Sequence, residues 1–146
     1  LQGAPASTMK VLVDTSVWSL ALRRDAPEHG PQERELRELL REGRIVMMGP
    51  IRQELLSGIR AESQFKQVRG KLRAFGDIGL EREDYEEAAL CFNQCRAAGV
   101  QGGSVDFLIC AVALRRKLAI FTTDIDFRHY AKVLGVKLHE VRPALQ

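Results

Sequence analysis

Long hydrophobic runs are absent from this 146-residue sequence. No segment approaches the roughly 18 consecutive apolar residues that identify a membrane-spanning helix, which excludes an integral membrane protein. Internal repeats and low-complexity segments are absent too, which excludes a repeat architecture. We therefore expect a soluble protein of the cytoplasm that does not interact with a membrane.

Cysteine is scarce, and its pattern excludes a disulfide framework. The three cysteines are odd in number, include no Cys-x-x-Cys pair and follow no signal peptide, which favours reduced thiols in the cytoplasm. Cys91 and Cys95 are four residues apart on one expected helix, but no further soft metal ligand accompanies them. We therefore predict that both, like Cys110, pack in the core.

The net charge is close to balance. A formal charge of +3 and a pI of about 8.9 permit contact with an anionic polymer without requiring it. An apolar content of 45% in 146 residues suits one globular domain. Residues 1–8 are small or polar and precede Met9, so we interpret them as a cloning scar and residues 9–146 as the domain.

Hydrophobic runs of strand length alternate with segments of helical periodicity. This alternation predicts an α/β domain in which helices cover a central, mainly parallel sheet. The expected strands are 10–13, 44–48, 118–122 and 136–141. The expected helices are 15–24, 31–43, 49–59, 61–76, 82–99, 104–114 and a last one that carries Phe127, Tyr130, Ala131 and Leu134.

Two features of the helices lead to specific predictions. Helix 104–114 is apolar almost all round, so we expect it to be buried at the centre. Helices 61–76 and 82–99 are expected to form a hairpin beside the sheet. The inward face of the second is expected to carry Tyr85, Ala88, Ala89, Phe92 and Cys95.

The acidic residues fall into two groups. On the amphipathic helix near the N-terminus they have basic neighbours three or four residues away, as ordinary solvated pairs do. Asp14, Glu54 and Asp106 instead adjoin apolar sequence and have no such partner on their own helix. Asp124 similarly closes an apolar strand, although Arg128 would reach it if the chain turned helical there. Local pairing therefore does not account for this second group.

Taken singly, each of these acids has an ordinary structural explanation. Asp14 would cap the helix that follows it, Glu54 and Asp106 would lie favourably near helix N-termini, and Asp124 and Asp126 would form a turn. Their shared placement argues for more. Parallel α/β sheets place functional residues at the carboxyl ends of the strands, so we predict that the acids face one crevice.

Several carboxylates in one crevice repel one another, and cations or protons must offset that repulsion. Oxygen ligands without His or Cys suit Mg²⁺ or Mn²⁺, which commonly bind one or two carboxylates and keep waters for substrate phosphates. Two such ions would activate water and stabilise the leaving oxygen at a phosphodiester. Ser16 and Thr123 are supporting candidates, because hydroxyls orient waters and ions. The three histidines, His29, His129 and His139, lie outside the acidic motifs and are expected at the surface without a role.

Four motifs together resemble one known family. "VDTSVW", "IRQEL", "SVDFLICAVAL" and "FTTDIDF" are similar, in this order, to motifs of the PIN-domain ribonucleases, specifically the small VapC-type toxins. The likeness covers nearly everything from Met9 to Val141. It implies a single PIN-like, three-layer α/β/α domain and an Mg²⁺- or Mn²⁺-dependent endoribonuclease that hydrolyses RNA phosphodiester bonds. It also implies a homodimer that a VapB-type antitoxin inhibits.

The resemblance also carries the family's acidic positions onto this chain. Asp14, Glu54 and Asp106 match them, and Asp124 is the natural fourth metal ligand and catalytic residue. Asp126, two residues further on, is the alternative fourth ligand or a support for the last helix. Water is expected to attack the phosphorus at this site.

Basic residues outside the crevice are expected to bind flanking RNA phosphates. Each candidate also fits an exposed helix face or a cation near a helix end. The candidates are Arg23, Arg24, Arg52, Arg115 and Arg116.

The first helix carries an apolar strip formed by Trp18, Leu20 and Leu22. These side chains either join the core or receive an antitoxin helix, with an antitoxin arginine reaching the acids. Two other function classes remain open. One is a catalytically silent PIN module that binds RNA or a partner. The other is a phospho-aspartyl signalling or phosphatase domain, against which the absence of a second Asp two residues after Asp14 counts.

Overall fold

A parallel sheet lies at the centre of the molecule, for which the computed structural model describes residues 9–23 and 30–144. The strand order is β2-β1-β3-β4, and each pairing within these residues is parallel. The strands are β1 (Val11–Val13), β2 (Ile45–Val46), β3 (Ala119–Phe121) and β4 (Lys137–Leu138). Each lies inside a predicted strand and is shorter than it, so the predicted parallel sheet is confirmed.

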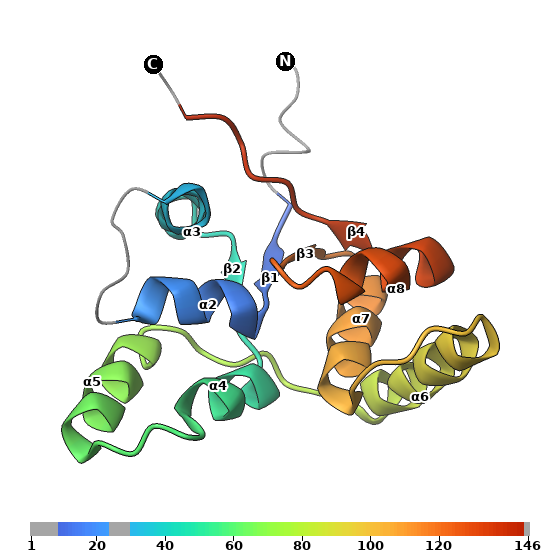
Figure 1. Ribbon diagram of the computed structural model, residues 1–146, viewed down its shortest axis with the longest axis horizontal. Coiled ribbons are helices and arrows are strands. Elements are labelled where there is room, and N and C mark those ends of the chain that lie inside the picture. The colour runs from blue at the N-terminus through green and yellow to red at the C-terminus, as the bar shows by residue number, and fades with distance from the viewer. Residues whose placement is uncertain (1–8, 24–29, 145–146) are drawn as a thin grey trace.

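Helices cover both faces of this sheet, which gives the predicted three-layer α/β/α arrangement (Figure 1). Helices α2 and α3 lie on one side, α7 and α8 lie on the other, and α6 packs outside α7 and α8. Helix α4 follows β2 and packs against α2 and α5. The described helices are α2 (Thr15–Leu22), α3 (Pro31–Arg41), α4 (Gly49–Leu56), α5 (Glu62–Leu72), α6 (Arg82–Ala97), α7 (Ser104–Arg116) and α8 (Asp126–Leu134). None of them has the length and apolarity that a membrane span requires.

Helix α7 forms the middle of the core, as its all-round apolarity predicts. The seven residues from Phe107 to Ala113 are all buried. Cys91 and Cys95 of α6 and Cys110 of α7 are buried as free thiols, which confirms the predicted core packing. Burial raises the pKa of the Cys91 thiol to about 11, so this cysteine stays protonated at neutral pH.

The predicted hairpin between helices 61–76 and 82–99 is wrong. Helix α5 packs against α4, whereas α6 packs along α7 and α8 at the opposite end of the molecule (Figure 1). The connecting segment explains the difference. Asp77 bridges Met47 in a parallel pairing, and the Ile78 N–H donates to the Met47 carbonyl at 2.9 Å. These contacts carry the chain past the edge of the sheet and prevent a tight turn between the two helices.

The predicted inward face of α6 is wrong in part. Cys95 is buried as expected, and the Phe92 ring packs edge-on against Phe107 of α7, with 5.6 Å between ring centroids. Tyr85 and Phe92 are nevertheless 55% and 40% exposed. The reason is Asp84, which is fully buried and accepts hydrogen bonds from Arg115 at 2.5 Å and from Arg116 at 2.7 Å. This ion pair buries Asp84 against α7, while Tyr85 lines an open hollow between α6 and α7 and stays exposed.

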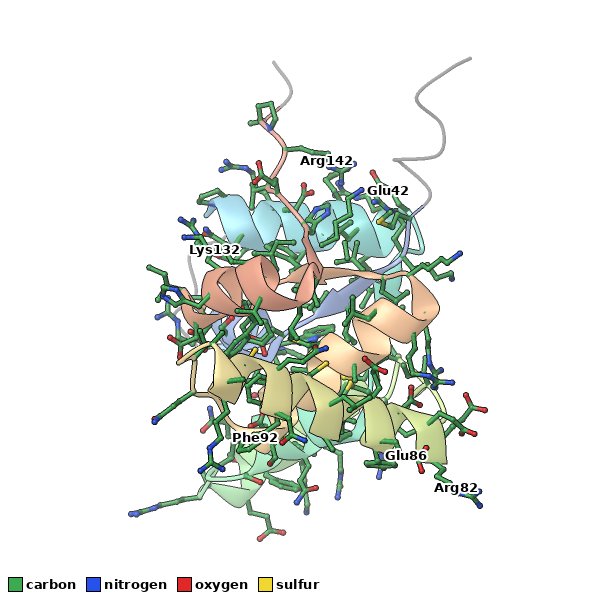
Figure 2. All side chains as sticks on the ribbon, turned by 90° about the vertical axis from the view of Figure 1, so that its right-hand side faces the viewer. Glu42, Arg82, Glu86, Phe92, Lys132 and Arg142 are labelled. Carbon is green, nitrogen blue, oxygen red and sulfur yellow. The ribbon has the colours of Figure 1, made fainter. Side chains whose placement is uncertain are left out.

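The C-terminal segment is tied to α3 by ion pairs. Arg142 binds Glu35 at 2.9 Å and Glu42 at 2.9 Å, and Figure 2 shows Arg142 beside Glu42. His139 Nε2 lies 2.5 Å from the buried Glu35 carboxylate. The prediction of a surface position for His139 is therefore wrong, since its side chain is only 10% exposed. This network fixes the chain directly after β4.

The apolar strip on α2 joins the core at Trp18. Its ring is 4% exposed and packs edge-on against Phe75, with 5.1 Å between ring centroids. Leu20 and Leu22 are half-buried. The core alternative therefore holds for Trp18.

Candidate active site

Asp14 lies at the junction between β1 and α2, where the capping explanation can be tested. Its backbone is extended before the helix, yet its side chain makes no capping hydrogen bond. Instead one carboxylate oxygen, Oδ2, accepts from Ser16 Oγ at 2.9 Å and from Thr122 Oγ1 at 2.8 Å. Thr122 follows β3, the strand beside β1. The carboxylate is therefore held by both neighbouring elements and is not used to cap the helix.

Three more carboxylates reach the same place from other elements. Glu54 on α4 accepts from Thr15 Oγ1 at 2.8 Å. Asp106, in the first turn of α7, accepts from the Tyr130 hydroxyl at 2.7 Å. Asp124, after β3, accepts through Oδ1 from the Asp126 backbone N–H at 3.0 Å. Together with Asp14, these acids line one hollow of about 530 Å³. Its other lining residues are Thr15, Ser16, Pro50, Gln53, Ser57 and Val105.

The electrostatics of Asp106 reflect this crowding. Burial raises the pKa of its carboxyl group, and the negative charges of Asp14, Asp124 and Glu54 raise it further. The hydrogen bond from Tyr130 acts in the opposite direction, because it stabilises the carboxylate. The hollow therefore has an excess of negative charge that favours an incoming cation.

Each of the four carboxylates is held through one oxygen only. The bound oxygens are Oδ2 of Asp14, Oε1 of Glu54, Oδ2 of Asp106 and Oδ1 of Asp124, and the second oxygen of each has no partner within the part of the chain that the structure describes. Every donor is a hydroxyl or a backbone N–H and carries no charge. These donors therefore bring no positive charge to the hollow, and each carboxyl group keeps a free oxygen.

This donor set fits a hard divalent cation. Over residues 9–23 and 30–144, no three acidic, histidine or cysteine side chains converge closely enough to enclose an ion by themselves. Mg²⁺ commonly binds one or two carboxylates and completes its shell with water, so full enclosure is not required. The free oxygens of Asp14, Asp106 and their neighbours are suited to that mode of binding.

Comparison with known proteins agrees with this geometry. The family model described as PIN domain matches residues 11–133. The chain belongs to the PIN-domain family. PIN domains are generally nucleases, which accords with an acidic hollow suited to metal ions. A search of curated proteins finds no match for this PIN domain.

Solved structures share the fold of this PIN domain at low sequence identity. The Neisseria gonorrhoeae FitAcB structure has a TM-score of 0.72 at 18% identity and covers 89% of this chain and 96% of its own. VapBC2 from Rickettsia felis, bound to a promoter DNA fragment, has a TM-score of 0.73 at 17% identity, with 90% and 98% coverage. DNA-bound VapBC from Salmonella typhimurium has a TM-score of 0.72 at 18% identity, with 90% and 97% coverage.

A hydroxyl network supports Asp14 in this PIN domain. Ser16 Oγ also accepts from the Thr123 backbone N–H at 3.0 Å, and Thr122 Oγ1 accepts from the Asp124 N–H at 3.0 Å. Ser16 therefore contacts Asp14 directly. Thr123 contributes its backbone N–H to this network.

Thr122 and Tyr130 hold site carboxylates, although the sequence ranks neither as a supporting residue. Thr122 directly follows β3, and the pairing of Val13 with Phe121 brings it beside Asp14. The sequence places Tyr130 only on the last helix. A fully buried tyrosine requires a partner for its hydroxyl, and that requirement is the signal that points to an acceptor such as Asp106.

Asp126 takes a different position from Asp124. It is exposed in the first turn of α8 and does not line the acidic hollow. Its backbone N–H holds Asp124. Burial and Asp106 raise the pKa of the Tyr130 hydroxyl, and the negative charge of Asp126 contributes to this rise. Arg128 forms no ion pair with Asp124 or with any other residue that the structure describes.

Three of the arginines expected to bind RNA have internal partners. Arg52 binds Asp77 at 2.8 Å and donates to the Leu72 carbonyl at 3.0 Å. Arg115 and Arg116 both bind the buried Asp84. These contacts account for the three side chains without RNA. Arg23 is exposed at the end of α2, and Arg24 lies outside the described residues.

Proposed function

We propose that this PIN domain is an endoribonuclease that hydrolyses RNA phosphodiester bonds with Mg²⁺ or Mn²⁺. The observation that carries the proposal is the hollow in which Asp14, Glu54, Asp106 and Asp124 meet from four parts of the fold. Four acids without a basic partner raise the energy of the metal-free site. A purely structural role would not require this repulsion between the acids, whereas a bound metal ion would relieve it.

The residues of the chain have separate roles in this proposal. Asp14 and Asp106 present their free oxygens to the ions, and Glu54 and Asp124 complete the ligand set from α4 and from the start of α8. Ser16 and Thr122 keep Asp14 in one orientation, and Tyr130 does the same for Asp106. When bound, Mg²⁺ or Mn²⁺ activates water for attack on phosphorus and stabilises the leaving oxygen.

The absence of a histidine among these side chains fits this division of roles. The described histidine nearest in sequence to the four acids, His129, is exposed on α8 and does not line the hollow. Among the described side chains that line the hollow, the carboxylates are therefore the groups able to accept a proton from the attacking water. Hydrolysis of a phosphodiester requires no group beyond these, the bound ion and the water.

We further propose that the chain is the toxin of a VapBC-type toxin-antitoxin pair. Its support is the fold shared, over nearly the whole length of both chains, with VapBC and FitAB complexes, some of them bound to DNA. A VapB-type antitoxin would be the inhibiting partner, and the active form would be a cytoplasmic homodimer. A catalytically silent PIN module is the competing function. Membership of the PIN family argues against a phospho-aspartyl domain.

The test is cleavage of labelled single-stranded RNA with Mg²⁺, with Mn²⁺ and with chelator. Asp14→Asn removes one ligand charge with little change of shape and is expected to reduce cleavage to the level seen with chelator. Glu86→Gln is the matched control, because Glu86 is exposed on α6 away from the hollow (Figure 2). Equal cleavage by wild type and Asp14→Asn would refute the proposed mechanism. Folded wild type that binds manganese but cleaves no RNA would identify a silent module.

The fourth ligand can be tested in the same assay. Asp124→Asn is expected to abolish cleavage, whereas Asp126→Asn is expected to retain it, because only Asp124 lines the hollow. The reverse result would assign the role to Asp126.

A further inference from the structure

A second hollow lies directly beside the acidic one. It has a volume of about 780 Å³ and is bounded by Gln32 at the start of α3, by the segment 121–128 and by the segment 138–141 after β4. Asp124 lines both hollows, so the short segment after β3 forms a wall between them. Ligand sites commonly have volumes of about 300–1,000 Å³, which leaves room here for a nucleotide.

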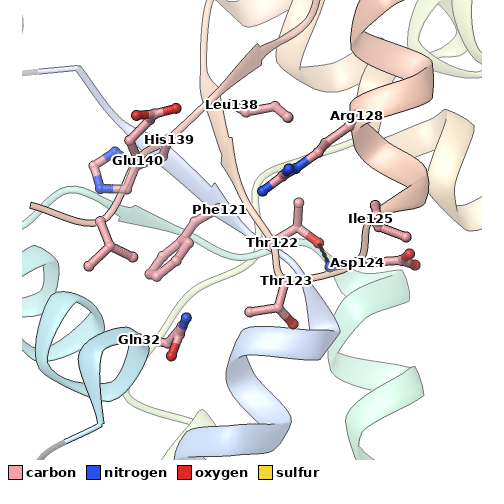
Figure 3. A pocket seen from close by; sticks show the side chains of 11 residues that line it. Gln32, Phe121, Thr122, Thr123, Asp124, Ile125, Arg128, Leu138, His139 and Glu140 are labelled. Carbon is pink, nitrogen blue, oxygen red and sulfur yellow. Dashed lines mark hydrogen bonds between the residues drawn. The ribbon is translucent and has the colours of Figure 1, made fainter.

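Arg128 supplies a positive charge to this hollow, whose lining also includes the acids Asp124 and Glu140. It is exposed on α8 and, among residues 9–23 and 30–144, has neither an ion-pair nor a hydrogen-bond partner. Figure 3 shows its guanidinium extending into the hollow toward Thr122, while the Asp124 side chain points away from it. Arg52, Arg115 and Arg116 are engaged elsewhere. Arg128 is thus free to bind an anion next to the acids.

The rest of the wall combines fixed polar groups with apolar surface. The buried Glu35 carboxylate holds His139, whose ring lies 5.4 Å from that of Phe121 between centroids. Gln32 offers an amide that both donates and accepts hydrogen bonds. Ile125 is 64% exposed at the rim and gives an apolar surface for the face of a base. The hollow therefore offers separate contacts for a phosphate, for a base edge and for a base face.

From this placement we propose that the second hollow binds a nucleotide of single-stranded RNA adjacent to the scissile bond, with Arg128 contacting its phosphate. The inference rests on the proposed nuclease function, because it takes the acidic hollow as the place where the scissile phosphate binds. A phosphate chain that enters an acidic site is repelled there, and a cation directly beside the site offsets this repulsion. Because Asp124 borders both hollows, two successive nucleotides of one RNA chain can occupy them.

The experiment measures RNA binding and cleavage separately. Binding of a short fluorescein-labelled single-stranded RNA of mixed sequence is followed by anisotropy in chelator, where no metal-dependent cleavage occurs. The variants are Arg128→Ala and Arg128→Lys, and Arg82→Ala is the matched control. Arg82 is exposed at the start of α6 and lines neither hollow, and its loss changes the net charge equally (Figure 2). Thermal unfolding checks that all variants are folded.

For Arg128→Ala we expect RNA binding about five- to ten-fold weaker than for wild type. This factor corresponds to the loss of one exposed charge-assisted hydrogen bond. The slope of log K against log salt concentration should fall in magnitude by about 0.7, as for one phosphate contact on a single strand. Arg128→Lys should restore most of the slope and part of the affinity, because lysine keeps the charge but loses the planar fork. In the metal-loaded enzyme KM should rise by a similar factor while kcat stays within about two-fold.

The outcomes separate this inference from the proposed function. If wild type cleaves RNA but Arg128→Ala and Arg82→Ala bind and cleave alike, the subsite is refuted and the nuclease stands. If Arg128 is needed for binding but wild type cleaves nothing with either metal, the RNA contact at Arg128 stands, whereas its place beside a scissile bond is refuted together with the nuclease. If wild type neither binds nor cleaves RNA but a protein partner binds through Arg128, both are overturned.

Discussion

Replacing Asp106 by asparagine tests the electrostatic argument directly, because it should stabilise the metal-free protein while removing a ligand. In wild type the Tyr130 hydroxyl donates to Asp106 at 2.7 Å. Asparagine has nearly the same shape as aspartate, and its side-chain oxygen can still accept this hydrogen bond. The substitution therefore removes the charge and leaves the packing. The three acids that raise the pKa of Asp106 lose a negative neighbour.

The magnitude follows from the repulsion between these charges. Two unit charges about 8 Å apart repel by roughly 2 kcal/mol at an effective dielectric near 20, and salt screens part of this. We expect a net gain of about 1 kcal/mol in the free energy of unfolding and a Tm about 3 °C higher. Differential scanning calorimetry in chelator measures both. Addition of manganese should stabilise wild type strongly and Asp106→Asn only weakly, since only wild type keeps the full ligand set.

The stability that Asp106→Asn gains over wild type should increase with pH. Because the folded pKa of Asp106 is raised, the native state holds more protons than the unfolded state between the ordinary Asp value, near 3.9, and the raised value. Wild type therefore loses stability as pH rises through that window, and Asp106→Asn does not. The advantage of the variant should be full at neutral pH and vanish below about pH 3.9. A variant less stable than wild type at neutral pH in chelator would refute the reasoning.

Asp84→Asn is the control for which we expect the opposite change, a loss of stability. Burial opposes ionisation of Asp84, but the backbone N–H of Glu81 and the guanidinium groups of Arg115 and Arg116 hold the pKa of its carboxyl group below the usual value. Its charge therefore stabilises the fold above the ordinary pKa, and this stability is lost as pH falls through the lowered one. Removing the charge leaves two arginines without their acid and should cost about 2–3 kcal/mol at neutral pH.

Two further predictions concern residues around the site and in the core. Tyr130→Phe should keep the fold but weaken manganese binding several-fold, measured by titration calorimetry, because Asp106 loses the donor that orients it; unchanged affinity would deny Tyr130 a positioning role. The three buried cysteines should not react with a thiol reagent at pH 8 until the protein is unfolded, since the Cys91 thiol has a pKa raised to about 11 and all three are shielded from solvent. Fast labelling of native protein would contradict that burial.

The elements that form the site could be predicted from the sequence because each carries a strong local signal. The apolar run before Asp14 ends at the helix start, and the one before Asp124 ends at Thr122. Parallel strands align their carboxyl ends, so two acids after adjacent strands meet without further information. The polar contacts between helices carry no such local signal. The burial of Asp84 depends on arginines about 30 residues away, and it determines which face of α6 turns inward.

The same lack of a local signal explains why the partners of the arginines could not be predicted from the sequence. Arg52 precedes Glu54 by two residues, and from sequence spacing it looks available for a phosphate near the acid. Its partner Asp77 lies 25 residues further on, in the segment that pairs with Met47. Only the course of that segment past the sheet reveals the ion pair. From the sequence alone, Arg128 is a candidate partner of Asp124. Only the position of the start of α8 shows that Arg128 forms no ion pair with the residues that the structure describes.

The donors that hold the acids come from distant parts of the chain, and this arrangement has a consequence for function. Thr122 reaches Asp14 across 108 positions, and Tyr130 reaches Asp106 across 24. These donors are neutral, so they fix the direction of each carboxylate without cancelling its charge. A lysine or arginine in the same place would hold the acid equally well but would compete with a metal ion. Because the fold directs Arg52 to Asp77 and leaves the acids with neutral donors, no basic side chain among the described residues compensates their charge, and that role is left to protons or to a bound cation.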